Sequence, residues 1–244
     1  MKRTGIFYGV GVGPGDPELI TIKALKTLEA CPVIAVPRSK DTSSDGQSQA
    51  LSVVKKIVDT KDKELLELLF PMTKDKAVLN SSRKEAAFMI AERLKEGKDA
   101  AFITLGDPML YSTFSYLLPL VTEALPGVEV RVIPGVVSFT AAASRALVPL
   151  AESDEKVIII PASYSLDEIR ESIKSFDTIV LMKVNKAFDS VLDMLFELGL
   201  ENSAFLASRV GWPGEEIVTD IKKLKGKRLD YFSTLVIRNP RSAV

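Results

Sequence analysis

The chain has 244 residues, of which 46% are hydrophobic and 26% are charged, a composition typical of a globular protein. Lys plus Arg and Asp plus Glu each total 32, and this neutral balance argues against general binding to nucleic acid or to a membrane surface. There is no histidine and only one cysteine, Cys31, which excludes an intrachain disulfide, the usual zinc sites and the Ser-His or Cys-His nucleophile systems. Any enzymatic chemistry must use positioning, carboxylates, Lys, Arg, Tyr or a bound cofactor.

The N-terminal residues run directly into a strand-like segment without the apolar core of a signal peptide. No apolar run reaches the ~18 residues that a membrane helix requires. Together with the single cysteine, these features predict a cytoplasmic protein.

Short apolar runs alternate with longer helical patterns along the chain. The expected strands are Ile6–Val12, Val33–Val36, Leu65–Phe70, Ala100–Leu105, Val128–Ile133, Val157–Ile160, Thr178–Met182, Ala204–Ser208, Glu216–Thr219 and Tyr231–Ile237. The helices expected between the earlier strands are Pro17–Glu29, Ser48–Val58, Lys76–Glu96, Met109–Ala124 and Phe139–Ala146. This alternation, with continuously apolar strands, indicates α/β sheets covered on both faces.

The rhythm of the elements suggests two domains. Residues 1–120 have the strand–helix alternation of a parallel sheet, whereas the closely spaced last strands of residues 121–244 suggest a mixed sheet. The polar stretch Arg38–Gln49 follows the second strand, where loops commonly line ligand sites. It is interpreted either as a lid over a substrate or as a solvated surface loop.

The first distinctive segment is a glycine-rich turn between a strand and a helix. Evenly spaced glycines occupy Gly11–Gly15, and a helix starts at Pro17 with Asp16 as a natural N-cap. The spacing differs from the G-x-G-x-x-G pattern of dinucleotide-binding turns, Pro14 lacks an amide donor, and Asp16 would repel a pyrophosphate. NAD binding is therefore disfavoured, which leaves a purely structural turn or a site for another ligand.

A second strand ends in a similar turn, Gly106-Asp107-Pro108, before a helical pattern. Asp107 can cap as Asp16 does, and Gly106 allows close approach of another group to the backbone. Two such turns at the ends of two strands suit a ligand with hydroxyls and an amine, such as a nucleoside bearing an amino acid tail. Two ordinary capped turns are the alternative.

The third segment combines a sharp turn with a narrow helix. Pro134 and Gly135 end a strand, Ser138 can cap the next helix, and small residues fill Thr140–Ser144. Either a flat ligand or a tightly packed neighbouring helix fits such a surface.

In their order and spacing, the three segments resemble the tetrapyrrole methylases. The family pattern has a G-x-G-P-G-D-P turn, a later G-D-P-x-x-Y turn and a P-G-x-x-S helix start, which correspond here to Gly11–Pro17, Gly106–Tyr111 and Pro134–Ser138. The resemblance covers nearly the whole chain. Within the family, Pro37–Lys40, Phe70–Thr73 and Pro149–Glu155 are most similar to the branch that methylates carbon 20 of precorrin-2 or cobalt-factor II. Leu105 and Lys183 stand where the bifunctional uroporphyrinogen methylases usually have glycines.

The resemblance implies two α/β domains of the tetrapyrrole methylase type, with the active site in a trough between them. It also implies S-adenosylmethionine as cofactor, S-adenosylhomocysteine as product, a small tetrapyrrole as substrate and a role in cobalamin biosynthesis. Apolar sequence in the second domain would suit a homodimer. The positions that match the family's cofactor contacts are Pro14, Leu105, Gly106, Asp107, Leu110, Val137, Ser138, Lys183 and Thr234.

Two further groups of residues follow from the chemistry of that reaction. Loss of a proton after methyl transfer requires a base, for which Asp16, Asp107 and Tyr111 are unranked candidates. The substrate carries many carboxylates, so cations beside the motifs and strand ends are candidates for binding them, with solvated surface charges as the alternative. These cations are Arg38, Lys40, Arg145, Lys183 and Arg209.

Competing functions remain open at this stage. Another branch of the family would methylate a different ring carbon, act in diphthine synthesis or methylate ribosomal RNA, although the neutral charge disfavours an RNA substrate. A non-catalytic ligand-binding module belongs to a different class and predicts binding without turnover. A cobalt chelatase is disfavoured because such enzymes commonly use histidine.

Overall fold

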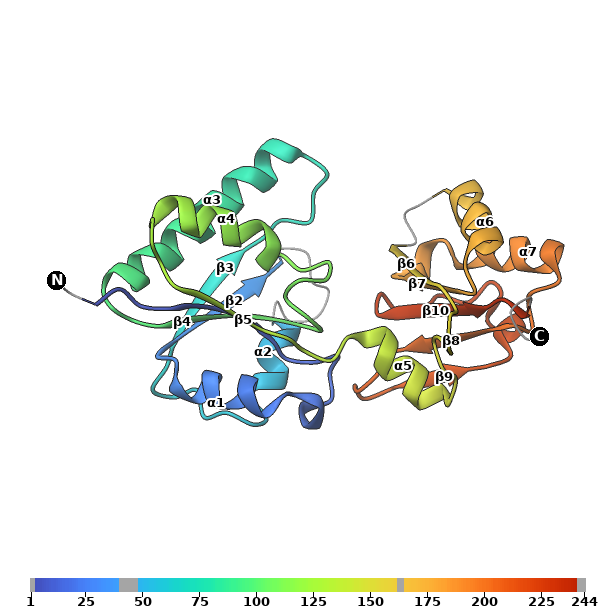
Figure 1. Cartoon of the computed structure of the whole chain (residues 1–244), viewed down its shortest axis with the longest axis horizontal. Coiled ribbons are helices and arrows are strands. Elements are labelled where there is room, and N and C mark those ends of the chain that lie inside the picture. The colour runs from blue at the N-terminus through green and yellow to red at the C-terminus, as the bar shows by residue number, and fades with distance from the viewer. Residues whose placement is uncertain (1–2, 40–47, 162–164, 241–244) are drawn as a thin grey trace. The chain divides into compact units, whose positions relative to one another are not determined.

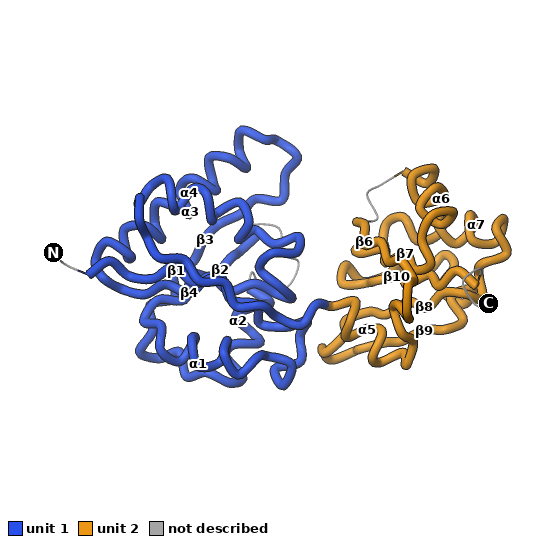
Figure 2. The backbone as a smooth tube through the Cα atoms, viewed as in Figure 1, with its two compact units in different colours: residues 1–137 blue, residues 138–244 orange. Residues whose placement is uncertain are grey.

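The structure is a computed structural model that describes residues 3–39, 48–161 and 165–240. The chain forms two compact units, residues 1–137 and residues 138–244 (Figure 2). The expected boundary at residue 120 differs from this division, because helix α4 (Phe114–Ala124) runs across that position. Strand β5 (Val130–Ile133) then pairs with β1 (Phe7–Gly11), which keeps the chain in the first unit as far as Val137.

A parallel sheet forms the centre of the first unit (Figure 1). Its strand order is β3-β2-β4-β1-β5, and all four pairings are parallel. The other strands of this sheet are β2 (Val33–Arg38), β3 (Glu64–Leu69) and β4 (Ala100–Thr104). Because the pairings are parallel, every strand presents its C-terminal end at the same edge of the sheet.

Helices cover both faces of this sheet. Helices α1 (Ile22–Ala30) and α2 (Gln49–Val54) lie on one face, and α3 (Lys76–Lys95) and α4 lie on the other (Figure 1). The segment expected as one helix from Pro17 divides into a 3₁₀ turn, η1 (Pro17–Leu19), and α1, because the Thr21 hydroxyl caps α1 by accepting a hydrogen bond from Ala24 N. The core contains Phe7, Phe102 and Phe114 against the buried face of α3.

The second unit is built on a mixed sheet of order β6-β7-β10-β8-β9. Only β6 and β7 are parallel, and the remaining pairs are antiparallel. The strands are β6 (Val157–Pro161), β7 (Thr178–Met182), β8 (Ala204–Ser208), β9 (Glu216–Val218) and β10 (Ser233–Arg238). All ten strands expected from the sequence are therefore present, and the α/β fold class is confirmed.

Helices also lie on both faces of the second sheet. Helix α5 (Ser138–Ala146) lies on one face, and α6 (Leu166–Ser175) and α7 (Phe188–Leu198) lie on the other (Figure 1). The short 3₁₀ helices η2 (Val184–Lys186) and η3 (Ile221–Leu224) follow β7 and β9. Apolar side chains of α6 and α7 pack on those of β7, β8 and β10 in one core. Among the described residues, no helix has the length and apolar character needed to cross a bilayer.

Candidate active site

The three sequence motifs meet at one edge of the first sheet. Strands β4, β1 and β5 are neighbours, so the turns that follow them lie beside one another. Gly106 N donates a hydrogen bond of 2.8 Å to Gly13 O, and these two residues form an isolated bridge between the first and second turns. The chain leaves β1 and β4 toward helices on opposite faces, which makes this a switch point where α/β sheets commonly bind ligands.

The turns are packed so closely that two of the glycines cannot carry a side chain. A Cβ on Gly11 would lie 2.5 Å from Gly106 O and 2.7 Å from Gly135 N. A Cβ on Gly135 would lie only 2.1 Å from the same Gly106 oxygen. The Gly106 carbonyl is therefore enclosed by the first and third motifs, and the three turns form a single backbone assembly.

Gly106 is required for a different reason. Its φ of +66° is in the left-handed region that favours glycine. A Cβ built on it would have Val137 Cα as its nearest neighbour, at 4.0 Å. The backbone at Gly106 is therefore accessible to a ligand. The surface formed by the turns around Gly106, here called the Gly106 cradle, fits a ligand held mainly through backbone groups, as the resemblance implies for S-adenosylmethionine.

The other cofactor positions expected in the first unit surround this cradle. Pro14 is buried in the first turn, Leu105 and Leu110 are half-buried in the second, and Val137 follows the third. The structure thus brings together Pro14, Leu105, Gly106, Asp107, Leu110 and Val137 within one unit. Ser138 begins α5 at the start of the second unit.

The two aspartates of the turns have unequal roles in the backbone structure. Asp16 Oδ1 accepts a hydrogen bond from Glu18 N at 3.0 Å within its own turn. Asp107 uses both oxygens: Oδ1 accepts from Met109 N at 2.8 Å, and Oδ2 accepts from Gly135 N at 3.0 Å. Asp107 therefore links the second motif to the third.

The segment after Asp107 is a turn rather than the expected start of a helix at Met109. Tyr111 has a positive φ of 51° and an exposed side chain. Ser112 is buried; its Oγ donates to Thr104 Oγ1 at 3.0 Å and accepts from Phe114 N at 3.2 Å, where α4 begins. Thr104 and Ser112 therefore support the turn, a role that was not predicted from the sequence, although a serine just before an apolar helical run is an N-terminal signal.

The positions expected in the second unit gather at one edge of its sheet. Strand β10 is antiparallel to both β7 and β8, so Thr234 pairs with Met182 on one side and with Ala207 on the other. Lys183 directly follows β7, and Arg209 directly follows β8, at this same edge. Thr234 is buried, whereas Lys183 is exposed.

Lys183 and Arg209 both have strained backbone conformations. Their φ values are 59° and 53°, in a region that non-glycine residues rarely occupy and that is over-represented at functional sites. Lys183 Nζ lies 5.3 Å from the centre of the Tyr231 ring. Arg209 is fixed by Asp230, with Nη1 to Oδ2 at 3.2 Å, and donates from Nε to Pro213 O at 3.0 Å.

The two other arginines expected to bind the substrate, Arg38 and Arg145, are held in ion pairs. Arg38, at the end of β2, pairs with Glu67 at 2.5 Å, and Arg145, in α5, pairs with Glu215 at 3.2 Å. Partly exposed pairs of this kind contribute only about 0–1 kcal/mol, so a substrate carboxylate can replace either acidic partner at low cost. Lys40 and most of the expected lid loop lie outside the described residues.

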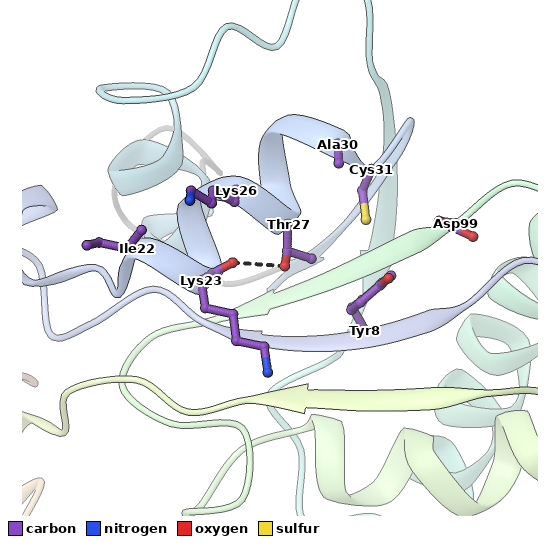
Figure 3. Close-up of a pocket in the computed structure, with 8 residues that line it drawn as sticks. All are labelled: Tyr8, Ile22, Lys23, Lys26, Thr27, Ala30, Cys31 and Asp99. Carbon is purple, nitrogen blue, oxygen red and sulfur yellow. Dashed lines mark hydrogen bonds between the residues drawn. The ribbon is translucent and has the colours of Figure 1, made fainter.

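A separate pocket of about 470 Å³ lies beside α1 in the first unit (Figure 3). Lys23 and Lys26 line it, together with Tyr8, Cys31 and Asp99. Burial raises the pKa of the Cys31 thiol to about 12, and burial also raises the pKa of Tyr8. The thiol therefore stays protonated near neutral pH, and this pocket does not present a thiolate nucleophile.

Comparison with known proteins identifies the class to which this fold and site belong. Residues 7–225 match the family model of the tetrapyrrole (corrin/porphyrin) methylases, and the chain is a member of that family. It is 45% identical to a probable cobalt-precorrin-2 C(20)-methyltransferase of Methanocaldococcus jannaschii over 72% of this chain and 71% of that protein. It is 33% identical to the cobalt-precorrin-2 C(20)-methyltransferase of Salmonella typhimurium over 96% of both chains.

A solved structure shares the fold at low sequence identity. The uroporphyrin-III C-methyltransferase of Thermus thermophilus, in complex with S-adenosylhomocysteine, superimposes with a TM-score of 0.66 at 19% identity. The match covers 97% of this chain and 99% of that one.

Proposed function

We propose that this protein transfers the methyl group of S-adenosylmethionine to carbon 20 of cobalt-precorrin-2 or a closely related tetrapyrrole in cobalamin biosynthesis. The observation that carries the proposal is the convergence of Gly11, Gly106 and Gly135 at the switch point of the first sheet, in a chain similar over 96% of its length to a cobalt-precorrin-2 C(20)-methyltransferase. Both relatives are cobalt-precorrin-2 C(20)-methyltransferases, one of them a probable one, which favours a cobalt-bearing substrate over the cobalt-free compound.

S-adenosylmethionine, when bound, supplies an activated methyl group on a cationic sulfur. The residues matching the family's contacts would hold it: Pro14, Leu105, Gly106, Asp107, Leu110 and Val137 from the first unit and Ser138, Lys183 and Thr234 from the second. The task of these residues is to hold the reacting atoms in line at about 3–3.5 Å and to exclude water, and such positioning can lower a barrier by about 7–11 kcal/mol. The absence of histidine from the chain is compatible with this chemistry.

The peripheral carboxylates of the substrate require cationic partners. Arg38, Arg145 and Arg209 are the described candidates, together with Lys40, which lies outside the described residues. Each of the three arginines is already directed by an acidic neighbour, which limits the rotamers of a long side chain before the substrate arrives. A guanidinium also suits bidentate binding of a carboxylate better than an ammonium group does.

The proton lost from the ring after methylation needs an acceptor. Asp16, Asp107 and Tyr111 are the candidates, and each carboxylate oxygen of Asp107 accepts a backbone hydrogen bond. Tyr111 has an exposed side chain beside the Gly106 turn, and Asp16 is half-buried beside Pro14.

We also expect a cytoplasmic homodimer. The second unit carries exposed apolar side chains, among them Leu147 at 89% and Phe196 at 42% exposure, which a partner subunit would shield. Sedimentation velocity at micromolar concentration tests this expectation, since a sample that stays monomeric contradicts it.

Product analysis tests the proposed activity. The protein is incubated with S-adenosylmethionine carrying an isotope-labelled methyl group and with precorrin-2 prepared with and without cobalt. We expect one label per product molecule at carbon 20 by NMR and faster turnover of the cobalt-bearing substrate. Label at another ring carbon, or none above a heat-inactivated control, contradicts the proposal.

A further inference from the structure

Asp107 lies in the Gly-Asp-Pro turn, where a carboxylate is either a reacting group or a part of the framework. Its two oxygens distinguish these roles, because each has its own backbone donor. Oδ1 accepts from Met109 N at 2.8 Å, and Oδ2 accepts from Gly135 N at 3.0 Å. The first bond closes the local turn, and the second crosses to the turn after β5.

The second of these hydrogen bonds joins two turns that are in close contact. Gly106 O lies so close to Gly135 that a Cβ there would be 2.1 Å away, and a Cβ on Gly11 would be 2.5 Å from the same oxygen. The Gly135 N–H donates to Asp107 and thereby offsets this crowding with a charge-assisted bond.

The place of Gly135 in the chain gives this bond a further consequence. Gly135 is followed by Val136 and Val137, where the first unit ends, and Ser138 begins the second. Asp107 therefore fixes the last turn of the first unit against the Gly106 cradle. Residues 135–137 include Val137, which is a cofactor position and the nearest neighbour of the open side of Gly106.

We propose that Asp107 is a positioning residue and not the catalytic base: its carboxylate ties the turn after β4 to the turn after β5 and so sets the shape of the cofactor cradle. This inference rests on the proposed function, because it assigns a role within the same site. It predicts that loss of the carboxylate affects cofactor binding first and the chemical step only as a consequence.

Asp107→Asn separates the two roles. Asparagine has one side-chain oxygen and therefore satisfies only one of the two N–H donors, while its amide group faces the other donor. Loss of a hydrogen bond to a charged group typically weakens an interaction by about tenfold to hundredfold. We expect the Kd for S-adenosylhomocysteine to rise by this factor, with kcat at saturating S-adenosylmethionine within about tenfold of wild type and an unchanged pH profile of kcat. A general base would give the opposite pattern, because its loss typically lowers kcat by about 10²–10⁴-fold while ground-state binding persists.

Asp75→Asn is the matched control. Asp75 caps α3 through Oδ1, which accepts from Ala77 N and Val78 N, and asparagine is an equally good N-cap. This variant should bind and react as wild type does. Circular dichroism on both variants checks that each is folded.

Amide hydrogen exchange on the wild-type protein tests the proposal without a variant. The Gly135 amide should be strongly protected in the absence of ligand. Free exchange of Gly135, or a collapse of kcat in Asp107→Asn at unaltered S-adenosylhomocysteine affinity, overturns the proposal. Wild-type protein that binds S-adenosylhomocysteine but methylates no tetrapyrrole would instead refute the proposed function and leave the positioning role of Asp107 intact.

Discussion

The C-terminal edges of the two sheets' central strands are built in different ways. In the first unit, the edge is made of glycine turns whose backbones lie in close contact, and Gly11 and Gly135 have no room for a side chain. In the second unit, the edge carries long cationic side chains, and Lys183 and Arg209 adopt the left-handed conformation without being glycine. The first edge requires glycine at two positions, whereas the second holds residues with long side chains in a strained backbone conformation.

The difference between the two edges predicts which substitutions each unit tolerates. Adding a methyl group should damage the first edge more than removing a charge, and the reverse should hold at the second. Substitutions at the two edges should therefore differ in their effects on stability and on ligand binding.

The largest effect is expected from Gly135→Ala. The new Cβ would lie 2.1 Å from Gly106 O, so the turns after β4 and β5 must separate. Overpacking typically costs about 1–3 kcal/mol, and we expect a lower Tm and loss of detectable S-adenosylhomocysteine binding by calorimetry. Gly5→Ala is the matched control, since its Cβ would lie 2.0 Å from Lys98 O, away from the turns. It should lower Tm similarly while the folded protein keeps its affinity.

Gly106→Val should abolish binding at a smaller cost in stability. Valine at a φ of +66° costs about 1–2 kcal/mol, and its side chain would fill the open side of the cradle. Circular dichroism should show a folded protein that no longer binds S-adenosylhomocysteine. Gly127→Val imposes a similar strain at φ +82° in a turn with no neighbour within 4 Å, so its affinity should be normal. Unchanged affinity in Gly106→Val would remove this turn from the site.

Arg38→Ala should affect the substrate alone. The Arg38–Glu67 pair is partly exposed, so its loss should change the free energy of unfolding by about 1 kcal/mol or less. If Arg38 binds a substrate carboxylate, KM for the tetrapyrrole should rise about tenfold to hundredfold, most of all at low salt. Arg131→Ala removes another exposed pair, with Glu129, and serves as the control. Equal kinetics in the two variants would show that Arg38 is a surface charge.

The smallest effect is expected from Lys183→Gly, and it has the opposite sign for stability. Glycine relieves the strain at φ 59°, so unfolding should become harder by about 1 kcal/mol or less after the entropy cost of glycine. S-adenosylhomocysteine affinity should fall severalfold. Ser153→Gly relieves a similar strain at φ 50° and should stabilise the protein without changing binding. A Lys183→Gly protein with full affinity would contradict a role for this side chain.

The sequence predicts the strands of this protein better than the starts of its helices. Apolar runs bounded by turns identified all ten strands, because a buried parallel or mixed sheet needs continuous apolar segments. Helix starts were harder to predict: α1 begins after Thr21 and α4 begins at Phe114, later than expected, since the preceding residues form turns fixed by hydrogen bonds. Helices α6 and α7 were not anticipated.

The candidate site was predictable where local sequence determines local shape. Asp16 and Asp107 cap their turns as expected. The bond from Gly135 N to Asp107 was not predictable, because it depends on β4 and β5 flanking β1, and strand order is not encoded in local pattern. The positive φ values at Tyr111, Lys183 and Arg209 also arise from tertiary packing, against the local preference of these residues.

Calorimetry on the wild-type protein with two ligands tests whether the glycine turns of the first unit hold S-adenosylmethionine and its product rather than a dinucleotide. We predict saturable binding of S-adenosylhomocysteine and no heat of binding with NAD under the same conditions. Micromolar binding of NAD without a signal from S-adenosylhomocysteine would contradict the account.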